Sequence, residues 1–169
     1  YVFDGDKGAP YLETDPPRPT GVYGATKLAG ERAVLASGAR AVILRTSWVY
    51  SAVRRTFLLT MLHAARKTDH LRVVADQIGC PTATADLAAA ILAIADRLAT
   101  EGWRPEFAGV FHAAGTGATS WHGLAQAVFA ASARYGGPQP TVAAITTGDW
   151  PTPVRRPPDS RLDCTRLHR

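Results

Sequence analysis

A tyrosine and a lysine four residues apart, Tyr23 and Lys27, are the residues of this chain whose types and spacing could do chemistry. They stand in the run Tyr-Gly-Ala-Thr-Lys-Leu-Ala-Gly-Glu, which we predict to be helical, and residues four apart share one face of a helix. An ammonium group beside a phenol favours the phenolate, so the pair can act as a general acid or base toward a substrate oxygen. The alternative is a solvated surface pair, because two residue types at one spacing also recur by chance.

The elements around this pair predict an α/β fold. We expect the helix to begin at Thr20 or Gly21 and to end at Gly38, a typical helix-terminating residue. The apolar run 41–44 that follows predicts a buried strand, and a helix between two buried strands favours a parallel sheet with crossovers. Because ligands of open α/β sheets bind beyond the carboxyl ends of the strands, we expect a binding site around residues 45–48.

The remaining elements continue the alternation of strands and helices. Thr84 and Ser120 are predicted to cap helices, and the apolar stripe of the first of these two helices is expected to be core packing. The predicted strands are 71–74, 110–114 and 142–145, and the predicted helices are 54–67, 84–98 and 121–135.

Composition excludes several classes of function. The chain has 169 residues, 46% hydrophobic and 20% charged, and a formal net charge of +5, which is ordinary for a globular protein. Without a run of eighteen apolar residues we expect no membrane span, and without a nucleic-acid motif we expect no nucleic-acid partner. Cys80 and Cys164 lack CxxC spacing and the histidines lack metal spacing, so we expect reduced thiols, a cytoplasmic location and no metal site.

Several motifs follow one another in an order that points to a known family. They are YVFDG at 1–5, the helix with Tyr23 and Lys27, RTSWVY at 45–50, DQIGCPT at 76–82, WPTP at 150–153 and RRPPDSRLD at 155–163. In this order the chain resembles the extended short-chain dehydrogenase/reductase family and, more narrowly, the dTDP-4-dehydrorhamnose reductases. The resemblance implies a partial Rossmann-like parallel sheet with helices, formed mainly by residues 1–75. It also implies a small C-terminal substrate-binding α/β region, mainly residues 76–169, from which some strands and helices return to the Rossmann-like part.

The resemblance also implies an activity. Enzymes of this family use NADPH or NADH to reduce the C4 keto group of dTDP-4-dehydro-L-rhamnose to dTDP-L-rhamnose. Tyr23 would supply the proton, and Lys27 would hydrogen-bond the nicotinamide ribose as well as acidify the phenol. Alternatives within the same fold are an epimerase or dehydratase that keeps its nicotinamide bound, and a non-catalytic regulatory subunit.

Three further residues receive substrate-side roles from the resemblance. Trp48 would pack on the sugar, Gln77 would help to form the substrate side of the cleft, and Arg156, with Arg161, would lie near the diphosphate. Their alternatives are a packed aromatic, a structural turn and a solvated basic tail. Thr56 stands where the family usually has asparagine, which sets this segment apart.

The resemblance finally predicts what lies outside this sequence. The glycine-rich turn that holds the cofactor pyrophosphate and the catalytic Ser or Thr belong to the family's amino-terminal half. We therefore expect this chain to be an interior piece of a reductase, inactive alone and either weakly stable or self-associated. Some family members form homodimers and use Mg²⁺, for which no complete ligand set is visible here.

Overall fold

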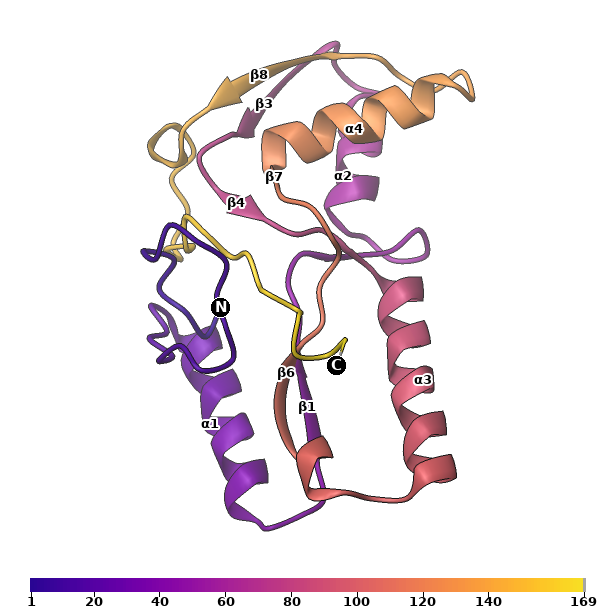
Figure 1. Cartoon of the computed structure of the whole chain (residues 1–169). Helices are drawn as coiled ribbons and strands as arrows, with labels where there is room; N and C mark the ends of the chain where they lie inside the picture. The colour runs from indigo at the N-terminus through magenta and orange to yellow at the C-terminus, as the bar shows by residue number, and fades with distance from the viewer. Residues whose placement is uncertain (169) are drawn as a thin grey trace.

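The computed structural model describes residues 1–168 and shows an α/β fold in which helices alternate with short strands (Figure 1). The elements in chain order are α1 (Val22–Ala36), β1 (Val42–Arg45), β2 (Val49–Tyr50), α2 (Phe57–Ala64), β3 (His70–Val74), β4 (Ile78–Gly79), β5 (Thr82–Ala83), α3 (Thr84–Glu101), the 3-10 turn η1 (Pro105–Phe107), β6 (Gly109–His112), β7 (Thr119–Ser120), α4 (Trp121–Ala133), β8 (Thr141–Ile145) and the 3-10 turn η2 (Thr147–Asp149).

The strands pair mostly in parallel, which confirms the predicted fold class. β1 pairs with β6, β2 with β5 and β3 with β8 in parallel, while β4 and β7 are antiparallel. Within residues 1–168 these pairs remain separate two-stranded ladders instead of one continuous sheet. Two of them, β1–β6 and β3–β8, join segments on either side of residue 75, so the boundary between the two predicted regions stays a prediction.

The helices divide between two ends of the molecule (Figure 1). α1 and α3 lie on opposite sides of the β1–β6 pair, and α2 and α4 lie together beside β3 and β8. One buried cluster joins the amino-terminal segment to α1 through Val2, Phe3, Tyr11 and Leu28. The second cluster fills the end with α2 and α4, and its buried members are Ala65, Val73, Ala125 and Phe129.

The start of α2 differs from the prediction. The helix begins at Phe57 instead of Arg54, because Ser51 draws the preceding residues into a turn. Its hydroxyl accepts hydrogen bonds from the backbone N–H groups of Val53 and Arg54, at 2.9 and 3.3 Å. Such local side-chain bonds offer the backbone an alternative to the helix.

The helix α3 departs from the prediction in two ways. Its N-cap is Ala83, and Thr84 is the first residue of the helix. No side chain caps this end, so the predicted cap was wrong. The stripe expected to be core is incompletely covered, since every residue of α3 is at least partly exposed and Ile91 is 49% exposed. The other predicted cap is confirmed: the Ser120 hydroxyl accepts a 3.0 Å hydrogen bond from the backbone of Gly123. Among residues 1–168, no helix is both long and apolar enough to cross a membrane.

Candidate active site

The tyrosine and lysine of α1 lie together and face a cavity. Lys27 Nζ is 5.4 Å from the centroid of the Tyr23 ring, as the spacing of four residues predicts. Both residues line a cavity of about 420 Å³. Tyr23 is 59% exposed, so its hydroxyl group is open to a ligand. This arrangement can exchange a proton with an oxygen atom held in the cavity.

The cavity is formed by α1, the end of β1 and the two terminal segments of the chain. Its walls include Tyr1–Phe3, the residues from Leu44 to Val49, and a segment that we call the C-terminal strap, residues 157–163. α1 approaches the first residue closely, because a Cβ on Gly24 would lie only 2.1 Å from the carbonyl oxygen of Tyr1. The Tyr1 ring meets the Tyr23 ring edge-on, with 6.1 Å between their centroids.

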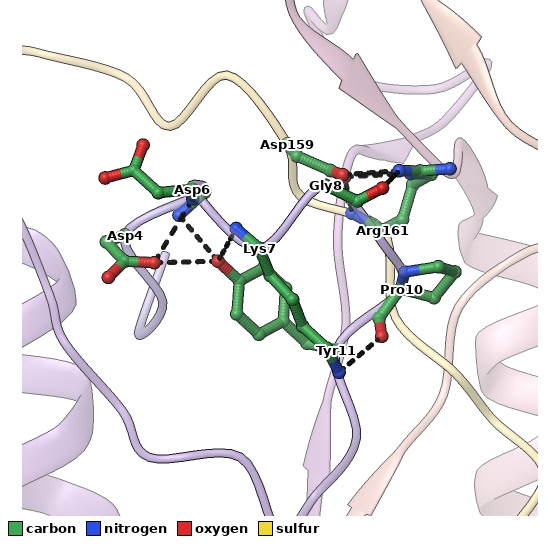
Figure 2. Close-up of polar contacts among 9 residues, drawn as sticks. Asp4, Asp6, Lys7, Gly8, Pro10, Tyr11, Asp159 and Arg161 are labelled. Atoms are coloured by element: carbon green, nitrogen blue, oxygen red, sulfur yellow. Dashed lines mark hydrogen bonds and ion pairs between the residues drawn. The ribbon is translucent and has the colours of Figure 1, made fainter.

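The C-terminal strap is fixed to the amino-terminal loop (Figure 2). Arg161 pairs with both carboxylate oxygens of Asp159, and its Nη2 also donates to the carbonyl of Gly8 at 3.0 Å. The backbones are joined as well: Tyr11 N–H donates to Arg161 and Asp163 N–H donates to Tyr11, at 2.9 and 2.8 Å. Arg161, predicted to lie near the diphosphate, thus uses its Nε and Nη2 donors to hold the cavity wall.

The amino-terminal loop is itself ordered around the Tyr11 hydroxyl (Figure 2). This hydroxyl donates to Asp4 Oδ1 at 2.7 Å and accepts from the backbone N–H groups of Gly5 and Lys7 at 2.9 and 3.2 Å. The hydrogen bond from Tyr11 holds the pKa of the Asp4 carboxyl below its usual value, and burial raises the pKa of the Tyr11 phenol. The loop therefore presents a preformed surface on which the strap rests.

Trp48 lines the cavity but is also part of the packed interior. Its ring stacks on Trp121 with 3.6 Å between centroids and an angle of 8°, and the residue is only 9% exposed. A Cβ on Gly79 would lie 2.4 Å from the indole, so the stack depends on that glycine. Trp48 also has φ of +46°, a conformation that a bulky residue adopts only when its surroundings enforce it. Because Trp121 covers one ring face, the predicted contact with a sugar would use the remaining surface of the indole.

The other two predicted substrate residues lie farther from the cavity. Gln77 is buried, and it donates to Thr147 Oγ1 at 3.0 Å and accepts from Trp121 Nε1 at 3.2 Å. It thereby supports the tryptophan on which Trp48 stacks. Arg156 is exposed, and its charge partly offsets the effect of burial, which raises the pKa of the Tyr1 phenol. In the described part of the chain, neither residue lines the cavity.

Two further candidates received no individual role in the sequence analysis, although Arg45 begins the predicted binding segment 45–48. Glu31 and Arg45 line the cavity and form an ion pair in which Arg45 Nη2 lies 2.7 Å from Glu31 Oε2. Glu31 could have been recognised, because it stands four residues after Lys27 on the same helical face. Residues 1–168 contain no group of three or more His, Cys, Asp or Glu side chains that could hold a metal ion.

Comparison with known proteins gives a consistent result. The family model of the RmlD substrate binding domain matches residues 1–169. A dTDP-4-dehydrorhamnose reductase of Sinorhizobium fredii is 44% identical over 169 residues, which are 100% of this chain and 57% of the relative. A crystal structure of a dTDP-4-dehydrorhamnose reductase from Clostridium acetobutylicum superposes with a TM-score of 0.87 at 36% identity, covering 99% of this chain and 55% of the other.

A second similar solved structure contains bound NADP. The dTDP-4-dehydrorhamnose reductase of Bacillus anthracis in complex with NADP has a TM-score of 0.84 and 33% identity, covering 99% of this chain and 55% of the other. The chain thus spans about half the length of the relatives it matches.

Proposed function

This chain belongs to the RmlD substrate binding domain family, and on that basis we propose that it forms the proton-transfer and substrate side of a dTDP-sugar reductase. The reaction is the reduction of the C4 keto group of dTDP-4-dehydro-L-rhamnose to dTDP-L-rhamnose with NADPH or NADH. The observation that carries this proposal is the cavity with Tyr23 and Lys27 on its wall, their side chains adjacent and open to a ligand. The names of the relatives support the choice of substrate.

Each candidate residue of this chain has a separate role in the proposed reaction. Tyr23 donates its phenolic proton to the carbonyl oxygen of the sugar as that oxygen gains negative charge. Lys27 stabilises the phenolate that remains. Trp48 limits the position of the sugar through the part of its side chain that lines the cavity, and Gln77 supports this wall through Trp121. Arg156 adds positive charge on the side where a diphosphate would bind.

We assign the Lys27 side of the cavity to part of a nicotinamide cofactor. The exposed ammonium of Lys27 and the hydroxyl of Tyr23 offer hydrogen bonds of the kind that ribose hydroxyls accept and donate. When bound, the cofactor supplies the hydride, while the protein supplies position and electrostatics. We assign residues 1–75 mainly to the cofactor side and residues 76–169 mainly to the substrate side. A homodimer and, in the complete enzyme, a requirement for Mg²⁺ remain predictions.

We place the reaction in the cytoplasm. Cys80 and Cys164 are free thiols, and a reducing compartment keeps thiols in this state. The pKa of each thiol is raised by burial, so neither is prone to form the reactive thiolate.

The proposal is tested by following the cofactor. The protein in the full length that its gene encodes is mixed with a dTDP-4-keto-6-deoxy sugar and NADPH or NADH, and reduced cofactor and product are both quantified. A reductase consumes one reduced cofactor for each sugar formed. An epimerase or dehydratase converts the sugar without net consumption, and a regulatory subunit leaves both unchanged; either outcome would refute the proposal.

A further inference from the structure

The helical face that carries the catalytic pair holds a third charged residue. Tyr23, Lys27 and Glu31 are spaced by four residues along α1, and all three line the cavity. A lysine and a glutamate at this spacing attract each other. If Lys27 paired with Glu31, its ammonium would turn toward the C-terminal end of α1 and away from Tyr23. Glu31 is therefore a competitor for the cation that the proton transfer needs.

Arg45 binds the Glu31 carboxylate and keeps it from Lys27. Its Nε donates to Glu31 Oε1 and Oε2 at 2.9 and 3.2 Å, and its Nη2 donates to Oε2 at 2.7 Å. The two side chains are only 9% and 12% exposed, so water screens the pair weakly. An arginine fork engages both oxygens of a carboxylate at once. Lys27, in turn, forms no ion pair with any carboxylate in residues 1–168.

The position of Arg45 is fixed from several sides. It ends β1 in register with His112 of β6, and its guanidinium lies over the Phe3 ring at 5.1 Å from the centroid. Its Nη1 is buried and has no hydrogen-bond partner within the described chain. Glu31 is thus the carboxylate that balances the charge of Arg45.

The second carboxylate of the cavity is restrained in the same way. Asp159 also lines the wall, and the Arg161 fork binds both of its oxygens. The other titratable groups at this end of the cavity are the phenol of Tyr1, which meets Tyr23 edge-on and lies within the field of Arg156, and the amino group of Tyr1, on which Arg45 and Glu31 act in opposite directions. Both acidic residues of the wall are therefore held by arginines, which leaves the Lys27 ammonium available to Tyr23.

We propose that Arg45 is a positioning residue that withholds Glu31 from Lys27 and so keeps the ammonium beside the Tyr23 phenol. This inference rests on the proposed function for its effect on turnover. Its effect on the phenol can be tested without turnover.

The test compares a single variant with a double variant of the full-length protein. In Arg45→Gln the released Glu31 pairs with Lys27, so the phenolate loses its counter-charge. We expect kcat to fall about tenfold with KM little changed, and the alkaline limb of the reduction profile to move up by about one pH unit. In Arg45→Gln combined with Glu31→Gln no carboxylate remains to capture Lys27, so kcat and the pH profile should return most of the way to the wild-type values.

Recovery of kcat on adding Glu31→Gln would show that Arg45 acts by holding Glu31, because a purely structural defect of Arg45→Gln would persist in the double variant. A double variant as slow as Arg45→Gln, or a single variant with wild-type kcat and pH profile, would overturn the inference. Thermal unfolding checks that each variant is folded. If Arg45→Gln is not folded, Arg45→Met, which keeps an aliphatic stem and removes the charge, is compared with its own Glu31→Gln double variant in the same way.

A measurement without substrate keeps this inference distinct from the proposed function. The protein is labelled with ¹³C at the tyrosine ring, and the Tyr23 signal is assigned by its loss in Tyr23→Phe. If Arg45 withholds Glu31 from Lys27, this signal should titrate at higher pH in Arg45→Gln than in the wild type and in the double variant. An unshifted signal would contradict the positioning role of Arg45 even if the protein reduces keto sugars. A shifted signal in a protein that reduces no keto sugar would contradict only the proposed function.

Discussion

At the scale of single residues, His112 is a buried titratable group to which the proposed reaction gives no role. It is fully buried at the end of β6, and its Nδ1 lies 3.0 Å from the carbonyl of Tyr11 and 3.2 Å from that of Asp163. Its Nε2 has no hydrogen-bond partner among residues 1–168. Burial lowers the pKa of this imidazole below its ordinary value of 6.5, an effect that Glu13 partly opposes and the charge of Arg45 reinforces.

This environment predicts a pH dependence of stability. A histidine whose folded pKa is depressed stabilises the fold fully above its unfolded pKa, and this contribution is lost as the pH falls below 6.5. We expect the melting temperature to decline between about pH 7 and pH 5 and His112→Asn to flatten that decline. Calorimetry across this range provides the check. Carboxylates such as Asp4, whose pKa is lowered from 3.8, act only at more acidic pH, so an equally steep decline in His112→Asn would exclude the histidine as its cause.

The sequence predicts the chemistry of single residues better than their packing. The adjacency of Tyr23 and Lys27 follows from helix geometry, and Glu31 follows from the same rule. The stack of Trp48 on Trp121 joins residues 73 positions apart in sequence (121 minus 48), and no local pattern signals it. Likewise, nothing in the sequence distinguishes Arg156, which stays exposed, from Arg161, which holds Asp159.

At the scale of elements, α1 must sit close to the start of the chain to present its pair of residues. Gly24 allows this approach, since a Cβ there would lie 2.1 Å from the Tyr1 carbonyl oxygen and 3.0 Å from Pro19 Cβ. Gly30, on the same helix, has open space within 4 Å among the described residues. The two glycines therefore provide a matched pair for mutation.

We predict opposite effects of alanine at these two positions. Alanine is favoured over glycine in a helix by about 1 kcal/mol, so Gly30→Ala should raise the melting temperature by about 2 to 4 °C. Gly24→Ala gains the same propensity but forces α1 away from Tyr1, so it should lower the melting temperature. Thermal unfolding followed by circular dichroism compares the two. A stabilised Gly24→Ala variant would show that the close approach of α1 is not required.

Element boundaries were predictable where a local signal exists. Ser120 caps α4, and Gly38 has φ of +71° just beyond α1, as expected of a helix terminator. The two-residue strands β2, β4, β5 and β7 are too short to leave a periodic pattern. Their partners come from distant segments, so only the folded chain defines them.

At the scale of the whole molecule, the accessible surface of the chain is larger than that of a typical folded monomer of the same mass. Its accessible surface is 10386 Å², whereas a folded monomer of 18.0 kDa typically exposes about 8,000 Å². Part of the excess is apolar and lies on helices, at Val22, Val34 and Leu35 of α1 and at Ile91 and Leu92 of α3. Large exposed apolar areas favour association with another surface.

We therefore predict that the isolated 169-residue chain self-associates. Sedimentation velocity at increasing protein concentration should show a growing weight-average mass, and the thermal transition should depend on concentration. A monomer at all concentrations with one sharp, concentration-independent transition would contradict this.

The long-range ties of the C-terminal strap mark the limit of sequence reasoning at this scale. The strap bonds to the loop around Tyr11 and also to β4, where the Ile78 N–H donates to Pro158 and the Ser160 N–H donates to Ile78, both at 2.8 Å. The proline- and arginine-rich composition of this segment predicts only a loop. The cavity wall that it completes emerges only from the fold.

The substitution Tyr23→Phe in the full-length protein tests the central claim most directly. It removes the phenolic proton and leaves the ring and Lys27 in place, so kcat for keto-sugar reduction should fall by about 10² to 10⁴ while the dissociation constants for cofactor and sugar change little. Single-turnover kinetics and equilibrium binding on the same preparation give both quantities. Near-normal turnover in Tyr23→Phe would show that the proton comes from another group and would contradict the account.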